Sequence, residues 1–203
     1  MTKNQFSFNF VAEIGCNHQG SLKHAFKMID TLVNFCEVKF VKFQKRNPME
    51  LLGEKRYNKP HPVPKNSFGE TYGLHREKLE LNYAQHKKIQ KYCKSRKIEY
   101  MCSAWDVTSL KELIKLKLKH IKIPSACNNN IELLECLFKN FNGICHISLG
   151  MTNIAEENKI VKLAKKYKRL KKLILYACTS DYPVKQDDIC LLEIVRLKKK
   201  YSK

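Results

Sequence analysis

Polar side chains recur at the ends of several apolar, strand-like runs in this chain of 203 residues. In parallel α/β proteins, ligands bind at the carboxyl ends of the strands, so residues at these positions are candidates for chemistry. In chain order they are Glu13, Asn17, His18, Lys42, Gln44, Ser103, Asp106, Lys122, Ser125, Ser148, Thr179, Ser180 and Tyr182. One polar residue after a strand is common, but recurrence after every predicted strand indicates a shared site.

Two lysines give this set its chemical character. Lys42 and Lys122 stand inside otherwise apolar segments, FVKFQ and HIKIPS. Burying an ammonium group without a partner is costly, so inward-facing lysines among several hydroxyl groups favour a ligand with phosphate or carboxylate groups. The alternative is that these lysines point into solvent, which is the interpretation we prefer for Lys39.

Strand-like runs alternate with segments of helical periodicity. The predicted strands are 8–14, 37–43, 98–103, 119–123, 143–149 and 172–178. The predicted helices are 21–35, which Ser21 would cap, and 84–96, 107–117, 130–139, 154–168 and 188–200. Residues 45–80 hold four of the six prolines and show no clear periodicity, so we expect a long excursion there.

Strand–helix units without a hairpin predict an α/β fold, in which helical crossovers join the strands of a parallel sheet. Such a sheet is either doubly wound or closed into a barrel. A complete (β/α)8 barrel typically needs about 250 residues, so this chain is about two units short of one.

The formal net charge of +20 invites a nucleic-acid interpretation, which we do not favour. Only six basic residues are arginine, the side chain that reads phosphates and bases best, and 33 are lysine. Most lysines lie between apolar positions of helical segments, which is typical of solvated helix faces. We expect no nucleic acid as a partner.

The chain shows no sign of a membrane or an oxidising compartment. No apolar run reaches about 18 residues, and the first residues lack the pattern of a signal peptide. The nine cysteines are scattered, without CxxC pairs, which is typical of buried, reduced thiols. We therefore expect a cytoplasmic protein that does not bind a membrane.

Blocks with a specific pattern occur in order along the chain: AEIGCNHQG (12–20), VKFQ (41–44), SAWD (103–106), KIPSA (122–126), ISLGM (147–151) and CTSDYP (178–183). Together they resemble the N-acetylneuraminate (sialic acid) synthase family, which includes legionaminate, pseudaminate and spore-coat polysaccharide synthases. The resemblance implies a (β/α)8 TIM-barrel-type fold. Residues 1–203 would form an incomplete barrel domain of about six β/α units, without the family's C-terminal antifreeze-like domain.

The resemblance also implies a reaction, catalysed by a carbon–carbon bond-forming transferase of sialic acid and surface polysaccharide biosynthesis. The family condenses phosphoenolpyruvate with an N-acetylated aldose, such as N-acetylmannosamine, to a nine-carbon 2-keto acid sugar and phosphate. A divalent metal, manganese or magnesium, polarises the sugar aldehyde, and the phosphoenolpyruvate methylene carbon attacks it. Water then attacks C2, and phosphate leaves by C–O cleavage. A homodimer is implied for a full-length form.

The resemblance assigns roles to individual residues. The catalytic set is Glu13, Lys42, Gln44 and Lys122, and the substrate-binding set is Ser103, Ser125, Ser148, Ser180 and Tyr182. The lysines and the first three serines would hold the phosphate and carboxylate of phosphoenolpyruvate. Glu13, supported by Gln44, would assist the intermediate or the attacking water, and Tyr182 would contact the sugar. Ser180 stands where a common family version has asparagine, and Asn17 and His18 would order the first loop.

Each of these residues, taken alone, also has a purely structural interpretation. Glu13 could bond to backbone at a strand end, and Tyr182 before Pro183 could close a turn. The ordered blocks favour the site for Glu13, Lys42, Lys122 and Ser148.

The chain also departs from the family pattern. The blocks whose histidines bind the metal, at strands seven and eight, have no counterpart after residue 183. We therefore expect no metal ligand in this chain and no metal site of the family kind in this polypeptide alone. Cys127 replaces a glutamate that contacts the sugar in one branch, and Leu149 replaces a frequent threonine. The sequence leaves the sugar open.

Three explanations of the incomplete barrel remain: a fragment or truncated gene, which we favour, a barrel completed by a second chain, or a decayed product. Two other functions also stay open. One is an inactive remnant or interaction subunit, and the other is a basic nucleic-acid-binding protein.

Overall fold

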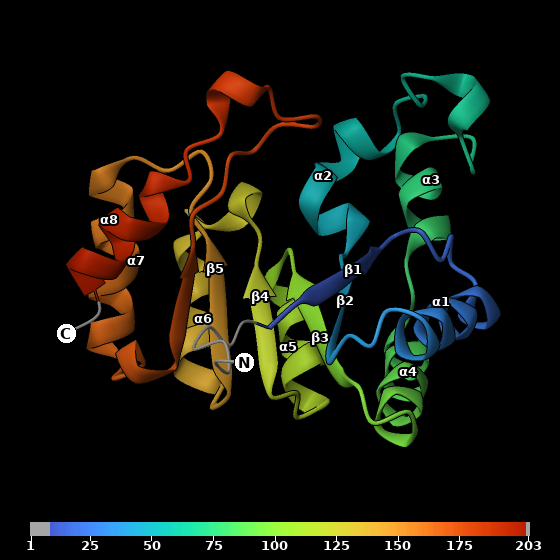
Figure 1. Cartoon of the computed structure of the whole chain (residues 1–203). Helices are drawn as coiled ribbons and strands as arrows, with labels where there is room; N and C mark the ends of the chain where they lie inside the picture. The colour runs from blue at the N-terminus through green and yellow to red at the C-terminus, as the bar shows by residue number, and fades with distance from the viewer. Residues whose placement is uncertain (1–8, 202–203) are drawn as a thin grey trace. The chain divides into compact units, whose positions relative to one another are not determined.

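The computed structural model describes residues 9–201. Their backbone forms two compact units, one up to Cys102 and the other from Ser103 onward. In both units, strands alternate with helices (Figure 1). The predicted α/β class, with six parallel strands alternating with helices, is confirmed.

The first unit contains three strands, β1 (Val11–Gly15), β2 (Phe40–Lys45) and most of β3 (Glu99–Ala104). Its helices are α1 (Leu22–Asn34), α2 (Pro48–Tyr57), α3 (Tyr72–Leu79) and α4 (Tyr83–Ser95). β1 pairs in parallel with β2, and Glu13 lies opposite Lys42. The core is fully buried and includes Ile14, Ile29, Val41, Phe43 and Ile89.

The second unit contains β4 (His120–Ile123), β5 (Ile144–Ser148) and β6 (Leu173–Tyr176), which pair in parallel in that order. Its helices are α5 (Val107–Lys115), α6 (Ile131–Asn140), α7 (Ile154–Lys166) and α8 (Leu192–Tyr201). The register places Lys122 opposite His146, and Ser148 opposite Tyr176. The core is built from side chains such as Leu110, Ile121, Leu133, Phe138 and Ile147.

Side-chain caps determine where most helices begin, because they satisfy backbone N–H groups that lack a partner in the first turn. The predicted cap of α1 is confirmed, since Ser21 Oγ accepts a hydrogen bond from the His24 N–H at 3.2 Å. Asn82 and Asn153 form reciprocal capping boxes at α4 and α7. These short polar signals let the helix starts be read from the sequence.

The structure differs from the predicted boundaries at the first two strands. β1 begins at Val11, three residues later than expected, and Phe8 lies outside the described residues. β2 begins at Phe40, three residues later than expected. Glu37 has a left-handed conformation, with φ of 49°, and therefore cannot belong to the strand. Lys39 is exposed, as we expected.

The excursion at residues 45–80 contains two helices, α2 and α3, that periodicity did not indicate. α2 begins with Pro48 after the Asn47 cap and is interrupted at Gly53, where φ is 65°. α3 contacts α2 through Gly73, where an added Cβ would overlap the Tyr57 ring. Both helices are short and only weakly amphipathic, so caps and a close glycine contact define them rather than an apolar stripe.

The nine thiols are free, and four are buried: Cys93, Cys102, Cys127 and Cys145. Burial raises the pKa of Cys93, Cys102 and Cys145 to about 12 each, so they pack as small apolar groups. The expectation of buried cysteines was wrong for Cys36, Cys178 and Cys190, which lie in exposed loops. Within residues 9–201, no helix is both long and apolar enough to cross a bilayer.

Candidate functional site

The first cluster of predicted site residues lies where β1 and β2 end. The Lys42 ammonium forms an ion pair with the Glu13 carboxylate on the neighbouring strand. Gln44 Nε2 donates to the other carboxylate oxygen of Glu13 at 3.3 Å. Lys42 is 9% exposed, whereas Glu13 is open to solvent. The structure thus brings together three of the four residues expected to be catalytic.

Gly15 lets Glu13 and Gln44 approach each other. The register between β1 and β2 slips by one residue after Glu13, a bulge that redirects the end of β1. Gly15 has φ of 58°, and a Cβ there would come within 3.3 Å of both the Glu13 carboxylate and the Gln44 amide. A side chain at this position would therefore be strained and would crowd the cluster.

Arg46 extends this cluster toward the segment before α4. Its Nη1 donates to Glu80 Oε1 at 2.9 Å and lies 2.9 Å from Cys16 Sγ, and its Nη2 donates to Gln44 Oε1. The Arg46 backbone N–H also donates to Glu80 Oε2 at 3.1 Å. Burial raises the pKa of the Glu80 carboxyl even against the opposing effect of Arg46. Arg46 thereby fixes the Gln44 amide that faces Glu13.

His18 orders the first loop, and Asn17 beside it is exposed. The His18 ring is 1% exposed, packs on Phe43 and accepts a hydrogen bond from the Gly20 N–H at 3.1 Å. Burial lowers the pKa of His18 to about 4, so the ring is neutral at pH 7. A neutral ring suits the acceptor role that this loop requires.

The second cluster belongs to the second unit and contains Lys122, Ser125, Ser148 and Ser180. Parallel pairing and the two-residue period of strands place Lys122, Ser148 and Tyr176 on one face of β4–β6. The Lys122 ammonium lies 5.6 Å from the centre of the Tyr176 ring. Lys122 is half-buried, and Ser148 is 3% exposed.

The hydroxyl groups of Ser125 and Ser180 lie close to the backbone of Gly150, just after β5. A Cβ at Gly150 would overlap Ser180 Oγ and come within 2.7 Å of Ser125 Oγ. The loop is held from below by the buried Asn128 amide, whose Nδ2 donates to Ser148 O at 2.8 Å, Gly150 O at 3.2 Å and Thr152 Oγ1 at 2.6 Å. Glycine at this position lets both hydroxyl groups come close to the backbone, where any other side chain would clash with them.

Two predicted site residues remain, Ser103 and Tyr182. Ser103 is in β3 and is 2% exposed. Tyr182 is 99% exposed in the segment between β6 and α8, where it contacts no core side chain. Its sugar contact stays a prediction.

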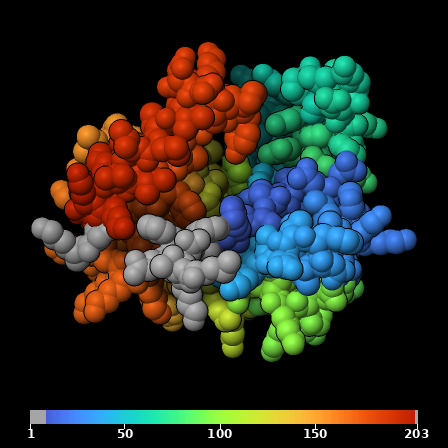
Figure 2. Space-filling model, viewed as in Figure 1, coloured from blue at the N-terminus to red at the C-terminus, as the bar shows by residue number. Residues whose placement is uncertain are grey.

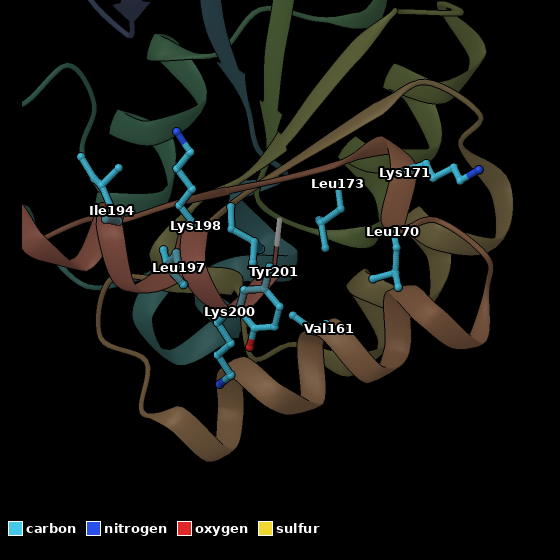
Figure 3. Close-up of a pocket in the computed structure, with 11 residues that line it drawn as sticks. Val161, Leu170, Lys171, Leu173, Ile194, Leu197, Lys198, Lys200 and Tyr201 are labelled. Carbon is cyan, nitrogen blue, oxygen red and sulfur yellow. The ribbon is translucent and has the colours of Figure 1, made fainter. Parts of the chain in front are cut away.

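A separate cavity of about 600 Å³ lies between β6, α7 and α8 (Figure 3). Its walls are mostly aliphatic, with Val161, Leu173 and Leu197 pointing into it and Tyr201 closing one side. Leu173 and Leu175 occupy the face of β6 opposite Tyr176. The cavity therefore lies on the other side of β6 from the polar cluster, and Lys171, Lys198 and Lys200 also line it.

Residues 28–203 match the family model described as the NeuB family. This chain belongs to the NeuB family. It is 30% identical to the N-acetylneuraminate-9-phosphate synthase of Homo sapiens over 189 residues, which cover 93% of this chain and 51% of that protein. It is also 30% identical to the N,N'-diacetyllegionaminic acid synthase of Campylobacter jejuni, covering 93% of this chain and 56% of that protein. The chain spans about half the length of the curated relatives it matches.

Solved structures agree with this NeuB-family membership. The N-acetylneuraminic acid synthetase of Leptospira borgpetersenii, in complex with citrate, superposes with a TM-score of 0.81 at 26% identity, covering 99% of this chain and 66% of that chain. A putative spore coat polysaccharide biosynthesis protein E from Chromobacterium violaceum superposes with a TM-score of 0.83 at 21% identity, covering 97% and 56%. The second likeness shows the shared fold alone.

The divalent metal expected for the NeuB family finds no fitting donor set in residues 9–201. No group of three or more His, Cys, Asp or Glu side chains there lies close enough to hold an ion. Several histidines have other hydrogen-bond partners: His18 accepts from Gly20, and His120 and His146 bond to each other. The residues that the structure describes therefore do not fit the metal.

Sequence reasoning missed Arg46 and Glu80 as parts of the first cluster and Asn128 as part of the second. Asn128 follows the KIPSA block by two residues, but its partners lie 20 to 24 residues further along the chain. Arg46 follows the VKFQ block by two residues, and its partner Glu80 lies 34 residues away. A polar residue just beyond each block was the available signal.

Proposed function

We propose that the protein is a phosphoenolpyruvate-dependent synthase that joins phosphoenolpyruvate to an N-acetylated aldose. The products would be a nine-carbon 2-keto acid sugar and phosphate. Membership of the NeuB family supports this class of reaction. The observation that carries the proposal is that the hydroxyl groups of Ser125 and Ser180 converge on the backbone at Gly150, in the unit that also holds Lys122.

The second cluster suits the anionic groups of phosphoenolpyruvate. Hydroxyl groups and exposed backbone N–H groups donate to phosphate oxygens, and a lysine ammonium balances their charge. We assign Lys122, Ser125, Ser148 and Ser180 to this binding role, together with Ser103. Charge stabilisation by donors already in place also favours departure of the phosphate, because the donors need no reorganisation as its charge develops.

The first cluster suits proton handling beside the reacting carbons. Lys42 balances the Glu13 carboxylate, and Gln44 orients it through a hydrogen bond. An anion that draws the Lys42 ammonium toward itself would leave the Glu13 carboxylate available as a general base for the attacking water. Tyr182 is assigned to the sugar because it is open to solvent near the end of β6.

The names of the relatives suggest which sugars to test. The human relative is named for a product with a phosphate at carbon 9, and the Campylobacter jejuni relative for a diacetylated product. Phosphoenolpyruvate contributes three carbons, so carbon 9 of the product is carbon 6 of the aldose. N-acetylmannosamine 6-phosphate, N-acetylmannosamine and a 2,4-diacetamido hexose are therefore the substrates of choice. We place the reaction in the cytoplasm, with a homodimer as the working form.

Phosphate release from phosphoenolpyruvate tests the proposal. The protein is incubated with phosphoenolpyruvate, manganese and each sugar, and phosphate and the 2-keto acid are measured together by ³¹P NMR and mass spectrometry. We expect one sugar to give both products in equal amounts, and a Lys122→Met variant to give neither. Absence of product with every sugar would reject the synthase assignment.

One observation favours a second candidate, a chain that binds phosphoenolpyruvate without turning it over. The described residues hold no donor set for the family's metal. This candidate predicts phosphoenolpyruvate binding that depends on Lys122, but no phosphate release. Binding and release are therefore measured on the same preparation.

A further inference from the structure

Three aromatic side chains form a hydrogen-bonded row across β4, β5 and β6. His120 Nδ1 lies 2.9 Å from His146 Nε2, and His146 Nδ1 lies 2.8 Å from the Tyr176 hydroxyl. Alternation along the strands places all three on the face that carries Lys122 and Ser148. The row thus shares one face of the strands with Lys122 and Ser148 of the second cluster.

The two hydrogen bonds of the row must run in the same direction, because His146 uses both ring nitrogens. A neutral imidazole donates through one nitrogen and accepts through the other. If the Tyr176 hydroxyl donates to Nδ1, then His146 donates from Nε2 to His120, and the opposite arrangement reverses both bonds. His146 is 4% exposed, so its ring has little room to turn. Burial raises the pKa of Tyr176, and its hydroxyl stays protonated in either arrangement.

The far end of this row meets Lys122. The Tyr176 ring is held at its hydroxyl by His146, and the Lys122 ammonium lies 5.6 Å from the ring centre. An aromatic face attracts a cation at this distance. A lysine side chain otherwise samples many rotamers, so a fixed ring narrows the positions that the ammonium visits before any ligand arrives.

We propose that Tyr176, anchored by His146 and His120, is a positioning residue that holds the Lys122 ammonium ready for the anionic substrate. This inference rests on the proposed phosphoenolpyruvate site and names what orders its lysine. The ordered sequence blocks did not indicate this row, because His120, His146 and Tyr176 lie just outside those blocks. The row belongs to the strands themselves, which makes it more rigid than a loop contact.

The geometry is tested first without any substrate. Lysines are labelled with ¹³C-methyl groups, which keep their charge, and the Lys122 signal is assigned by its loss in Lys122→Arg. We expect that signal to be displaced by the aromatic ring current, to stay displaced in Tyr176→Phe, and to join the bulk lysine signals in Tyr176→Leu. A Lys122 signal among the bulk lysines of the unaltered chain would overturn the inference, whatever the protein binds.

The positioning role is then tested by phosphoenolpyruvate affinity, measured by calorimetry on variants whose melting stays cooperative. We expect Tyr176→Leu to weaken binding roughly 3- to 20-fold, and Tyr176→Phe and His146→Leu to weaken it less, because both keep the ring. Ile174→Leu, on the same face of β6 but outside the row, is the matched control. If Tyr176→Leu does not fold, the phosphoenolpyruvate affinities of Tyr176→Phe and His146→Leu, compared with that of Ile174→Leu, still test the positioning role.

The outcomes separate the two proposals. Equal affinity of all folded variants would show that the row is only structural and would overturn the inference, while the synthase assignment stands. No binding by the unaltered chain, with the Lys122 signal displaced, would reject the phosphoenolpyruvate site and the positioning role with it. A graded loss of affinity that follows the Lys122 displacement supports both.

Discussion

At the scale of single residues, buried polar groups decide the shape of the candidate site. Asn128 is the clearest example, because one amide is bonded to Ser148 O, Gly150 O and Thr152 Oγ1. It holds the loop whose glycine, Gly150, lets the hydroxyl groups of Ser125 and Ser180 come close to the backbone. The hydroxyl groups would bind the ligand, and Asn128 fixes the loop on which they converge.

Asn128→Ala should therefore destabilise the fold and the site together. Loss of the amide leaves buried carbonyl groups without this donor, and we expect a decrease of about 2–3 kcal/mol in the free energy of unfolding, measured with urea. Asn129→Ala, an exposed neighbour, should change it by less than about 0.5 kcal/mol. Equal stability of the two variants would contradict the role given to Asn128.

The residues that could be predicted from the sequence are those that stand out against their own strand. Lys42 and Lys122 are charged residues in apolar runs, so their burial implied a partner before any contact was known. Asn128 gave no such signal, because asparagine is ordinary in a loop and its partners come from a distant segment. Tyr176 and His146 could not be paired without the register of β5 and β6.

At the scale of elements, the excursion between β2 and α4 is tied to the sheet by one buried ion pair. Arg46 at the end of β2 meets Glu80 just after α3, and both side chains are at least nine-tenths buried. Proline content and weak periodicity concealed α2 and α3, since caps and glycine contacts define them. The long excursion that the sequence predicted is thus an ordered segment whose two ends are joined by this ion pair.

Arg46→Met should cost roughly 3–5 kcal/mol of unfolding free energy, because it leaves the Glu80 carboxylate buried without its partner. The double variant Arg46→Met with Glu80→Met should cost clearly less than the sum of the two single changes. Arg56→Met, at an exposed position of α2, serves as the control for loss of a positive charge. Additive effects in this double-mutant cycle would show that the pair does not couple.

α8 is attached to α7 through the Glu157 carboxylate and the neighbouring Asn158 amide. Glu157 accepts hydrogen bonds from Lys200 at 2.9 Å and Tyr201 at 2.6 Å, and it pairs with Arg196. Figure 2 shows α8, in red, on the surface of the second unit. Burial alone would raise the pKa of Glu157, but hydrogen bonds from Arg196, Tyr201 and Lys200 outweigh it and lower the pKa to about 2.

Because this folded-state pKa lies below the ordinary value of 4.5, Glu157 stabilises the protein at higher pH. That contribution should be complete above about pH 5 and disappear as the pH falls toward 2. We expect Glu157→Gln to lose on the order of 2 kcal/mol at neutral pH and much less near pH 3, measured by urea unfolding. Glu193→Gln also removes a partner of Arg196, but its carboxylate is 45% exposed, so its effect should be small at both pH values. A pH-independent effect of Glu157→Gln would contradict the assignment.

At the scale of the whole molecule, the sequence predicted the order of strands and helices well. Each strand is a compact apolar run and most helices carry an apolar stripe and a side-chain cap, so local signals agree with the fold. Strand ends were less accurate, because left-handed turns such as that at Glu37 depend on the elements they join. The candidate site followed from the rule that ligands bind at strand ends, together with the family blocks.

Calorimetric titration of the chain with phosphoenolpyruvate tests the central claim most directly, because it measures the anion binding to which Lys42 and Lys122 are each proposed to contribute. We expect saturable binding that Lys42→Met and Lys122→Met each weaken at least about tenfold, a loss of about 1.4 kcal/mol. Lys39→Met, which removes an exposed lysine just before β2, should bind like the unaltered chain. Equal weakening by all three changes, or none by any of them, would contradict the account.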